Sequence, residues 1–489
     1  MKKKNSKIQL LKDIRLVHKS KQFDKKYYLR TNTDIKGKYR LFPSLHYVLH
    51  GWDERRKPNE FFSIREYLTF FEDEKKAINP IFFLEHHMSK NEYKNVKKHP
   101  VSVDVVLNQF LPSQALPLNS YYSKNKTIHR LNLVCWGFAE SDIFGGKATA
   151  IILAILFVNK YNYTLRVIAN GPDQAVIYKV CKNFNLTPPK SIEYFDTNLN
   201  GSIDITDNDH FIPTMWLCAD QLLKTPCICG KIFPLIQEVE NFFYDHGDFN
   251  LRSKLVLSND RLYPIINSKL LYDYLISDGY TNIRDNGVYF EPVFSKHMYK
   301  PSKNSFEKKE HYNLFFYGRP SHQRNLYYFG LECLERAFAE GVLDPKEWTV
   351  YIAGDSSVQE FSFSGNPEII RNGTMKWQEY CKMMGKMDLC FSMMYTPHPS
   401  YPPLDAVSSG CVTVTNRYLN KNDLSNYSKN IVMGDLNYDG IIDAIKRGSE
   451  LAKNNKLRKE NYLCTNTFGE WPEALEPVLC FMKKAIDSK

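Results

Sequence analysis

The chain has 489 residues, of which 43% are hydrophobic, and this length and content allow two or three domains with large cores. No apolar run reaches the ~18 residues that a membrane-spanning helix needs, and the basic N-terminus is not followed by the apolar core of a signal peptide. Eleven scattered cysteines predict reduced thiols rather than a disulfide framework. Cys227 and Cys229 are close in sequence, but without a second pair or nearby histidines they do not predict zinc. These features predict a cytoplasmic protein.

Most of the net charge of +11 is concentrated at the N-terminus. Residues 1–26 contain ten Lys or Arg and two Asp, a net charge of +8, which leaves +3 for the rest of the chain. The body of the chain therefore lacks the charge typical of a nucleic-acid-binding surface. Residues 1–22 form a basic tail with Leu10, Ile14 and Val17 at helical spacing. Two interpretations stay open: a solvated, disordered tail, or a peripheral contact with the anionic inner face of the plasma membrane, worth about 1 kcal/mol per basic residue near the surface.

Residues 23–100 contain a degenerate internal repeat with a spacing of 37–39 residues. Short helix signals and aromatic residues in each copy predict a small helical module. His46 and His50 share a helix face and could bind a metal, but no carboxylate or thiolate pattern accompanies them, which favours a structural role. Two segments of each copy correspond to each other: 23–29 with 62–68, and 42–47 with 79–84.

Residues 101–305 are predicted to form a first α/β domain. A strand at 131–136, a loop with Gly145 and Gly146, an apolar helix at 149–158 and a strand at 164–168 follow one another, as in the opening unit of a doubly wound fold. Strands are also predicted at 209–216 and 233–244. Asp207-Asn208-Asp209 could be a metal-binding Asp-x-Asp motif, but its place ahead of a strand favours an ordinary acidic turn.

Residues 306–465 are predicted to form a second α/β domain, and residues 466–489 a terminal helix. Strand-like and helix-like segments alternate here, which predicts a parallel sheet covered on both faces. The terminal helix has an apolar face that includes Leu475, Val478, Leu479 and Met482. The predicted strands are 313–317, 349–353, 388–394 and 412–415, and the clearest helix between them is 377–386.

Two motifs in this second domain point to an anion site. Arg319 and Arg324 flank the turn that follows the strand 313–317, and paired guanidinium groups can clamp phosphates. The segment from His398 to Asp405 follows another buried strand and contains two prolines where a helix would begin. A helix N-terminus at the carboxyl end of a parallel strand is a favourable diphosphate site. Asp405, expected in the first turn, could accept a hydrogen bond from a sugar hydroxyl.

These paired motifs resemble the nucleotide-sugar domain of the GT-B glycosyltransferases, specifically the retaining family 4 and its bacterial rhamnosyltransferase branch. The resemblance implies that Arg319 and Arg324 bind the donor diphosphate as catalytic groups and that Asp405 binds the nucleotide ribose. The chain departs from the general family pattern of two glutamates eight positions apart. Asp405 replaces the second glutamate and Pro397 the first, which puts the identity of the sugar in doubt more than nucleotide binding.

The resemblance also implies roles for residues across a cleft between two Rossmann-like domains. The glycine loop would approach the donor phosphates, and Gln237 and Glu240 resemble a Gln-x-x-Glu element on the acceptor side; a surface loop is the alternative. The terminal helix is expected to cross back to the first domain. The N-terminal module resembles helical modules of polysaccharide glycosyltransferases, with docking to the catalytic domains or to another glycosyltransferase as its expected role. The implied donor-binding set is Gly145, Gly146, Gly318, His398, Ser400, Tyr401 and Asp405.

The activity implied is metal-independent, retaining transfer of L-rhamnose from dTDP-L-rhamnose to a surface polysaccharide such as O-antigen, or to a lipid-linked glycan. No cofactor is expected, because the arginines and the helix N-terminus would stabilise the departing diphosphate. A UDP- or GDP-sugar donor is an open alternative, and so is a non-catalytic scaffold subunit. A sugar-nucleotide epimerase or a phosphorylase could share the fold, although no context for a pyridoxal-bearing lysine is seen.

Overall fold

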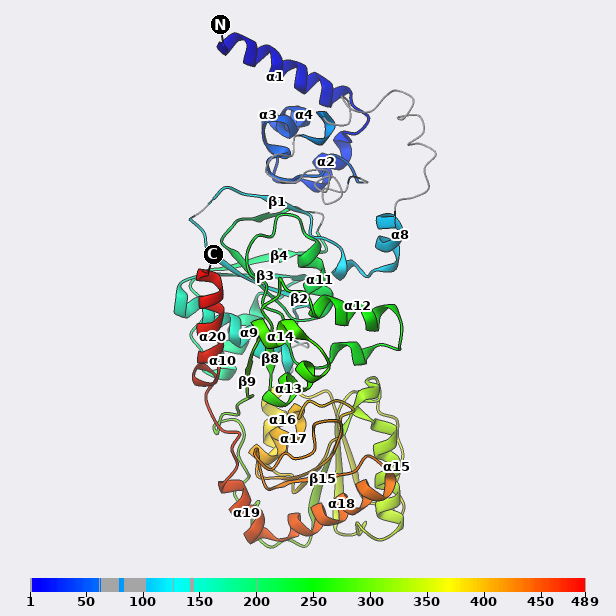
Figure 1. Ribbon diagram of the computed structural model, residues 1–489. Helices are drawn as coiled ribbons and strands as arrows, with labels where there is room; N and C mark the ends of the chain where they lie inside the picture. The colour runs from blue at the N-terminus through cyan, green and yellow to red at the C-terminus, as the bar shows by residue number, and fades with distance from the viewer. Residues whose placement is uncertain are drawn as a thin grey trace.

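The computed structural model describes residues 2–60, 62, 79–82, 103–125, 127–140, 145–199 and 201–488. Two α/β lobes lie one above the other, and a small helical module lies beyond the first lobe (Figure 1). Most of the second copy of the sequence repeat, and the predicted boundary between the module and the first domain, lie outside the described residues.

The C-terminal lobe is built on a six-stranded parallel sheet with the order β12-β11-β10-β13-β14-β15. In chain order this is 3-2-1-4-5-6, the doubly wound arrangement, and its switch point lies between β10 and β13. The four strands predicted for this domain are confirmed, although β13 is shorter than expected. The strands are β10 (Tyr312–Gly318), β11 (Trp348–Gly354), β12 (Ile369–Gly373), β13 (Leu389–Phe391), β14 (Val412–Asn416) and β15 (Ile431–Gly434).

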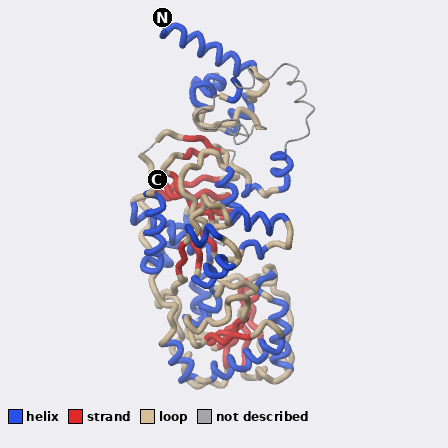
Figure 2. The backbone as a smooth tube through the Cα atoms, viewed as in Figure 1, coloured by secondary structure: helices blue, strands red, loops and turns tan. Residues whose placement is uncertain are grey.

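Helices cover both faces of this sheet, as the blue and red tubes of Figure 2 show. Successive side chains of β10 point to opposite faces. Leu314 and Phe316 pack in the core cluster of α15 and α18, whereas Phe315 packs in the cluster of α16 and α17. The helices are α15 (Tyr327–Ala339), α16 (Trp377–Met384), α17 (Tyr401–Ser408), α18 (Tyr438–Lys453) and α19 (Asn455–Leu463).

The N-terminal lobe repeats this plan. Its sheets β4-β3-β2-β6 and β7-β8-β9 are parallel, and single bridges from Phe211 to Ile232 and from Ile232 to Leu262 join them. The first sheet consists of β2 (Arg130–Gly137), β3 (Thr164–Asn170), β4 (Ile192–Asp196) and β6 (Asp209–Pro213); the second of β7 (Leu235–Ile236), β8 (Ile265–Asn267) and β9 (Val288–Phe290). The helices are α8 (Val103–Phe110), α9 (Gly146–Tyr161), α10 (Ala175–Phe184), α11 (Trp216–Lys224), α12 (Asp248–Leu257), α13 (Lys269–Ser277) and α14 (Thr281–Asn286).

Two strands predicted in this lobe are longer than those observed. The predicted strand 233–244 is mostly wrong: only Leu235–Ile236 is a strand, and Glu240–Phe243 forms a 3-10 helix. The prediction followed apolar content, but the polar residues after Ile236 leave the sheet and turn into the space between the lobes. The predicted strand 209–216 ends at Pro213, because Trp216 begins α11.

The terminal helix α20 (Trp471–Asp487) lies against the N-terminal lobe, beside α9 and α10 in Figure 1. Its apolar face, with Leu475, Val478, Leu479 and Met482, is buried in the core that α9 shares with the first sheet. The chain thus crosses from the second lobe back to the first, which ties the two lobes together at one side.

The N-terminal module packs short helices around Tyr28 and Tyr47, which are both fully buried. His46 has a structural contact, because its Nδ1 lies 2.9 Å from the hydroxyl of Tyr28. The basic segment is the helix α1, and Val17 belongs to the module core, so this member of the predicted apolar stripe is not available to a membrane. The elements are α1 (Lys2–Lys19), α2 (Lys25–Thr31), α3 (Lys38–Leu41), α4 (Pro43–His46) and a π-helix, η1 (Tyr47–Gly51).

None of the helices in the described ranges combines the length and apolar character that a membrane span requires.

The Asp-x-Asp segment has a structural role. Asp209 is fully buried at the start of β6, the end of the strand away from the space between the lobes. Its carboxylate accepts hydrogen bonds from Arg166 at 2.8 Å and Asn132 at 3.0 Å, while Asp207 accepts one from Tyr122 at the surface. In the part of the chain that the structure describes, no three His, Cys, Asp or Glu side chains are grouped to hold a metal.

Replacing Asp209 by Ala should therefore destabilise the protein by about 3–5 kcal/mol, because it removes the fully buried carboxylate that pairs with the buried guanidinium groups of Arg130 and Arg166. The matched change Asp207→Ala should cost less than about 1 kcal/mol. Chemical denaturation followed by tryptophan fluorescence measures both. Equal stabilities for the two variants would contradict the structural role of Asp209.

Candidate functional site

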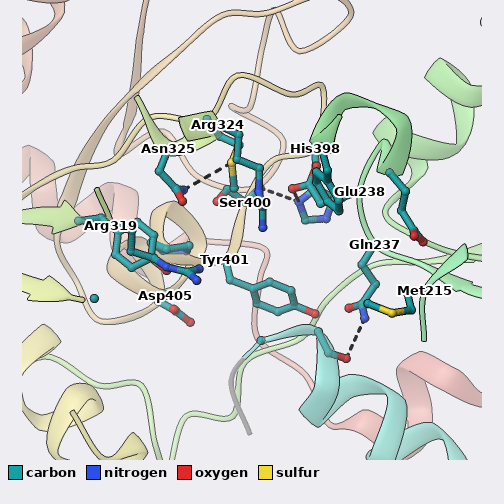
Figure 3. A pocket seen from close by; sticks show the side chains of 18 of the residues that line it. Met215, Gln237, Glu238, Arg319, Arg324, Asn325, His398, Ser400, Tyr401 and Asp405 are labelled. Atoms are coloured by element: carbon teal, nitrogen blue, oxygen red, sulfur yellow. Dashed lines mark hydrogen bonds and ion pairs between the residues drawn. The ribbon is translucent and has the colours of Figure 1, made fainter. Parts of the chain in front are cut away.

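A cleft of about 560 Å³ lies between the two lobes. It is lined by segments that follow strands of both lobes, at the carboxyl ends of the strands, where ligands bind in doubly wound folds. From the C-terminal lobe come residues after β10 and β13; from the N-terminal lobe come residues after β6 and β7 and the start of α9. Figure 3 shows side chains of both lobes that face this cleft.

Arg319 and Arg324, predicted as the diphosphate clamp, both line this cleft. Arg319 directly follows β10 and is held by the hydroxyl of Tyr317 at 3.3 Å and by a ring nitrogen of His322 at 2.9 Å. Arg324 stacks over the ring of Phe243, a residue of the opposite lobe, at 4.4 Å. Burial, followed by the charge of Arg319, lowers the pKa of Arg324, an effect that Glu238 opposes. The two cations therefore share one partly desolvated region that favours an anion.

The start of α17 has fewer free N–H groups than a helix N-terminus usually offers. Tyr401 is the first helical residue, and Pro402 and Pro403 follow it without N–H groups. The N–H of Ser400 donates to Nδ1 of His398 at 3.0 Å. The positive end of the helix still faces the cleft, but the two arginines must supply most of the donors for a diphosphate.

Asp405 lies in the second turn of α17, not in the first turn as predicted. It lines the cleft but is 4% exposed, and it accepts a hydrogen bond from the hydroxyl of Tyr380 at 3.2 Å. Burial raises its pKa to about 7, although hydrogen bonds from Tyr299 and Tyr380 oppose this shift. Near neutral pH the carboxyl group is therefore partly protonated and can donate as well as accept a hydrogen bond.

Tyr401 connects the lobes. Its hydroxyl lies 2.8 Å from Oγ1 of Thr149 on α9, and it accepts a hydrogen bond from Nδ2 of Asn267, at the end of β8, at 2.9 Å. Burial raises the pKa of the phenol to about 12, so it stays protonated. Tyr401 lines the cleft, but its hydroxyl group bonds to the opposite lobe.

Two of the three glycines predicted to bind the donor line the cleft, and the third does not. Gly145 and Gly146 line the cleft at the start of α9. A Cβ at Gly146 would lie 2.6 Å from Nε2 of Gln237, which donates to the carbonyl of Gly146 at 2.7 Å. Gly318 is not among the cleft residues: a Cβ there would lie 2.5 Å from Ile352, so the glycine permits close packing of β10 against β11.

The two residues predicted on the acceptor side, Gln237 and Glu240, have different contacts in the structure. Gln237 lines the cleft, where it holds the Gly146 loop. Glu240 reaches the cleft too, but one carboxylate oxygen accepts a hydrogen bond from the backbone N–H of Trp216 at 2.7 Å. It therefore caps the start of α11, and burial raises its pKa to about 8.

A polar cluster at the same wall of the cleft was not predicted from the sequence; it consists of Glu238, His398 and Lys421. Burial raises the pKa of Glu238, whereas the charges of Arg324 and Lys421 lower it. Its Oε1 lies 3.9 Å from Nδ1 of His398, and a hydrogen bond with Thr396 also lowers the pKa of Glu238. Glu238 lies within the predicted Gln-x-x-Glu element, between Gln237 and Glu240. That element was therefore the sequence signal from which Glu238 could have been predicted.

Lys421 is fully buried behind the cleft and donates to the carbonyl of Met394 at 3.0 Å. Burial lowers its pKa to about 7 and lowers the pKa of His398 to about 3, so this histidine is neutral. No sequence signal marked Lys421, because it stands in a polar stretch that is typical of a solvated loop. Glu238 and His398 lie on the same side of the cleft as Arg324 in Figure 3.

Comparisons with known proteins match both the fold and part of the sequence. Residues 312–446, which contain Arg319, Arg324 and the 398–405 segment, match the family model "WsaF, C-terminal domain". The O-antigen biosynthesis protein RfbC of Myxococcus xanthus is 24% identical over 250 residues, which are 50% of this chain; the chain spans 19% of the length of that relative.

Solved glycosyltransferase structures share the two-lobed fold. TarM of S. aureus superposes with a TM-score of 0.52, at 8% identity, over 74% of this chain and all of TarM, in a complex with UDP. A glycosyltransferase of Rickettsia africae gives a TM-score of 0.50 at 11% identity, over 74% of this chain and all of that chain. HepE of Anabaena in complex with UDP-glucose gives a TM-score of 0.50 at 11% identity, over 73% of this chain and 98% of that chain. The chain therefore has the GT-B fold, with two Rossmann-like lobes that face a cleft.

Proposed function

We propose that this protein is a glycosyltransferase that moves a sugar from a nucleoside-diphosphate donor to a glycan acceptor. One observation carries the proposal: two guanidinium groups converge at the switch point of the C-terminal lobe and face the other lobe across a cleft. Arg319 and Arg324 would bind the diphosphate by charge-assisted hydrogen bonds. The nucleoside would lie along α17, beside Asp405.

The chemistry follows from the charge that develops. As the bond between the anomeric carbon and the diphosphate oxygen breaks, the electron pair moves to the diphosphate, and the arginines stabilise this growing charge. In the proposed retaining transfer the acceptor hydroxyl oxygen bonds to the anomeric carbon on the same face, and its proton passes to the departing phosphate. Glu238, which lines the cleft, would orient the acceptor hydroxyl.

For the donor we propose dTDP-L-rhamnose, and for the acceptor a bacterial surface polysaccharide or a lipid-linked glycan. The resemblance of the 398–405 segment to the rhamnosyltransferase branch supports the donor. The relative named for O-antigen biosynthesis supports the acceptor class. We further propose a cytoplasmic location, with the basic face of α1 available to an anionic membrane or to another glycosyltransferase.

Arg319→Ala and Arg324→Ala should each lower turnover at least 100-fold, the scale of removing one donor that stabilises developing charge, roughly 3 kcal/mol. Arg336→Ala is the matched control, because that arginine lies on the outer part of α15 in an exposed pair with Glu340. Initial rates of sugar transfer measure the effect. Full activity in both cleft variants would show that the diphosphate lies elsewhere.

Binding of the free nucleotide tests the donor separately. Because a ligand that binds only the folded state stabilises it by about 2.7 kcal/mol at 100 times its Kd, dTDP should raise the Tm more than UDP or GDP at equal concentration. The melts are recorded in EDTA, since the proposed site holds the diphosphate through arginines. A larger shift with UDP or GDP would reassign the donor, and a shift that requires Mg²⁺ would contradict the metal-independent site.

The raised pKa of Asp405 predicts a pH-dependent stability. Between the ordinary aspartate pKa of about 4 and the raised value of about 7, the folded protein retains a proton that the unfolded chain has released. Stability therefore falls as pH rises through this window. Asp405→Asn removes the proton equilibrium, so its Tm should gain on the wild type from pH 5 to pH 7, on the order of a few degrees.

Asp423→Asn is the control for this measurement. The pKa of the exposed Asp423 is lowered, so its titration is complete below this pH window. A constant Tm difference between Asp405→Asn and the wild type would show that the carboxyl group of Asp405 is already ionised in the folded protein at pH 5.

A further inference from the structure

A second cavity, of about 360 Å³, lies where the N-terminal module meets the N-terminal lobe. We name it the seam cavity. Tyr27 and Thr31 of α2 form its module side. Its lobe side comes from the segment 113–119, from residues at the carboxyl ends of β3 and β4, and from α11. This volume is within the range of small-molecule sites, and no residue of the proposed donor site lines it.

Among the residues that the structure describes, those that line the seam cavity include no charged side chain, although 24% of the chain is charged. Its polar groups are amides and hydroxyls, and amides can both donate to and accept from a sugar hydroxyl. The amide nitrogens of Asn119 and Gln221 already donate to backbone carbonyls, so a sugar would bond mainly to the other polar groups of the lining. Tyr27 and Phe195 add aromatic surface of the kind that packs against apolar faces. Nucleotides, phosphates and acidic glycans would find no cation here, so the lining favours a neutral carbohydrate. The amide groups are those of Gln114, Asn119, Asn170, Asn198 and Gln221.

One helix connects this cavity with the cleft. Trp216, the first residue of α11, lines the cleft, whereas Cys218 and Gln221 of the same helix line the seam cavity. At 1.5 Å per residue, Trp216 and Gln221 are only about 8 Å apart along the helix axis. The cleft and the seam cavity are therefore separated by less than two turns of α11.

The module is fixed to the lobe at this position. Nδ2 of Asn119 donates to the carbonyl of Thr31 at 2.8 Å, and the guanidinium of Arg56 lies 3.8 Å from the ring centre of Tyr121. The backbone N–H of Tyr122, at the end of β1 (Ser120–Tyr122), donates to the carbonyl of Glu54 at 2.8 Å. In Figure 1 the module accordingly lies over β1. These contacts hold Tyr27 and Thr31 as part of the cavity wall.

We propose that the seam cavity binds a neutral glycan and that the N-terminal module completes this site. The proposal that this glycan is the growing acceptor rests on the proposed function. The sugars already added would lie in the seam cavity while the reactive end lies in the cleft.

The test compares two variants of the full-length protein, Tyr27→Ala and Gln114→Ala, with the matched control Tyr178→Ala. Tyr178 is 56% exposed on α10 and lines neither cavity. The probes are L-rhamnose oligosaccharides and, as a second neutral series, malto-oligosaccharides, each from one to six units. Binding is measured by calorimetry and by ligand-observed NMR without donor, and transfer is then measured with dTDP-L-rhamnose. Thermal melts establish that each variant is folded.

We expect the wild type and Tyr178→Ala to bind the longer members of one series more tightly than the monosaccharide. In Tyr27→Ala and Gln114→Ala this length dependence should be lost, with an approximately tenfold weaker Kd for the hexasaccharide and an unchanged Tm shift with dTDP. Absence of binding to both series, or equal binding by all four proteins, would overturn the proposal. If binding follows the expectation but no transfer occurs, the glycan site stands and the proposed function fails.

Discussion

The hydroxyl group of Tyr401 fixes the geometry on which the cleft depends. It belongs to α17 of the C-terminal lobe, yet both of its hydrogen bonds go to the N-terminal lobe, to Thr149 and Asn267. Since the phenol remains protonated at physiological pH, these bonds persist wherever the lobes are closed. They place the start of α17 opposite the start of α9, so groups on separate strands of two sheets face one volume. A phenylalanine would fill the same space but could not specify this relative position of the lobes.

The positive charges of the cleft are not fully compensated by negatively charged side chains. Arg319, Arg324 and Lys421 are opposed there mainly by Glu238, and burial lowers the pKa of Arg324 and Lys421. Desolvated cations are unfavourable unless they are paired, so an anionic ligand should stabilise the closed lobes. The buried, neutral His398 adds an Nε2 without a hydrogen-bond partner in the described residues. Donor binding and lobe closure are therefore expected to be coupled.

The GT-B fold and much of the cleft could be predicted because their signals are local. A strand followed by Gly318-Arg319, and a strand followed by the 398–405 segment, identify the carboxyl edge of a parallel sheet without tertiary information. The bond of Tyr401 to the other lobe and the helix-capping role of Glu240 could not be predicted from the sequence. Their partners, Asn267 and the backbone of Trp216, are distant from them in sequence. Lys421 resembled a solvated loop lysine because burial depends on the other lobe. The segment 233–244 was predicted as a strand because of its apolar residues. In the structure only two of its residues form a strand, and the segment continues into a 3-10 helix.

The two cavities differ in chemistry in the way that stepwise chain growth would require. A diphosphate must be held by charge and released after each transfer, and the cleft supplies cations for it. In the proposed reaction a growing glycan gains one neutral sugar in each cycle. Charged side chains are not needed to bind neutral sugars, because amides can form the same hydrogen bonds. A site of amides and hydroxyls forms many weak hydrogen bonds of similar energy, so the chain can shift by one unit without losing all of its contacts. The absence of charge among the described residues of the seam cavity, beside a charged cleft, fits the proposed role in holding a glycan better than a second nucleotide site.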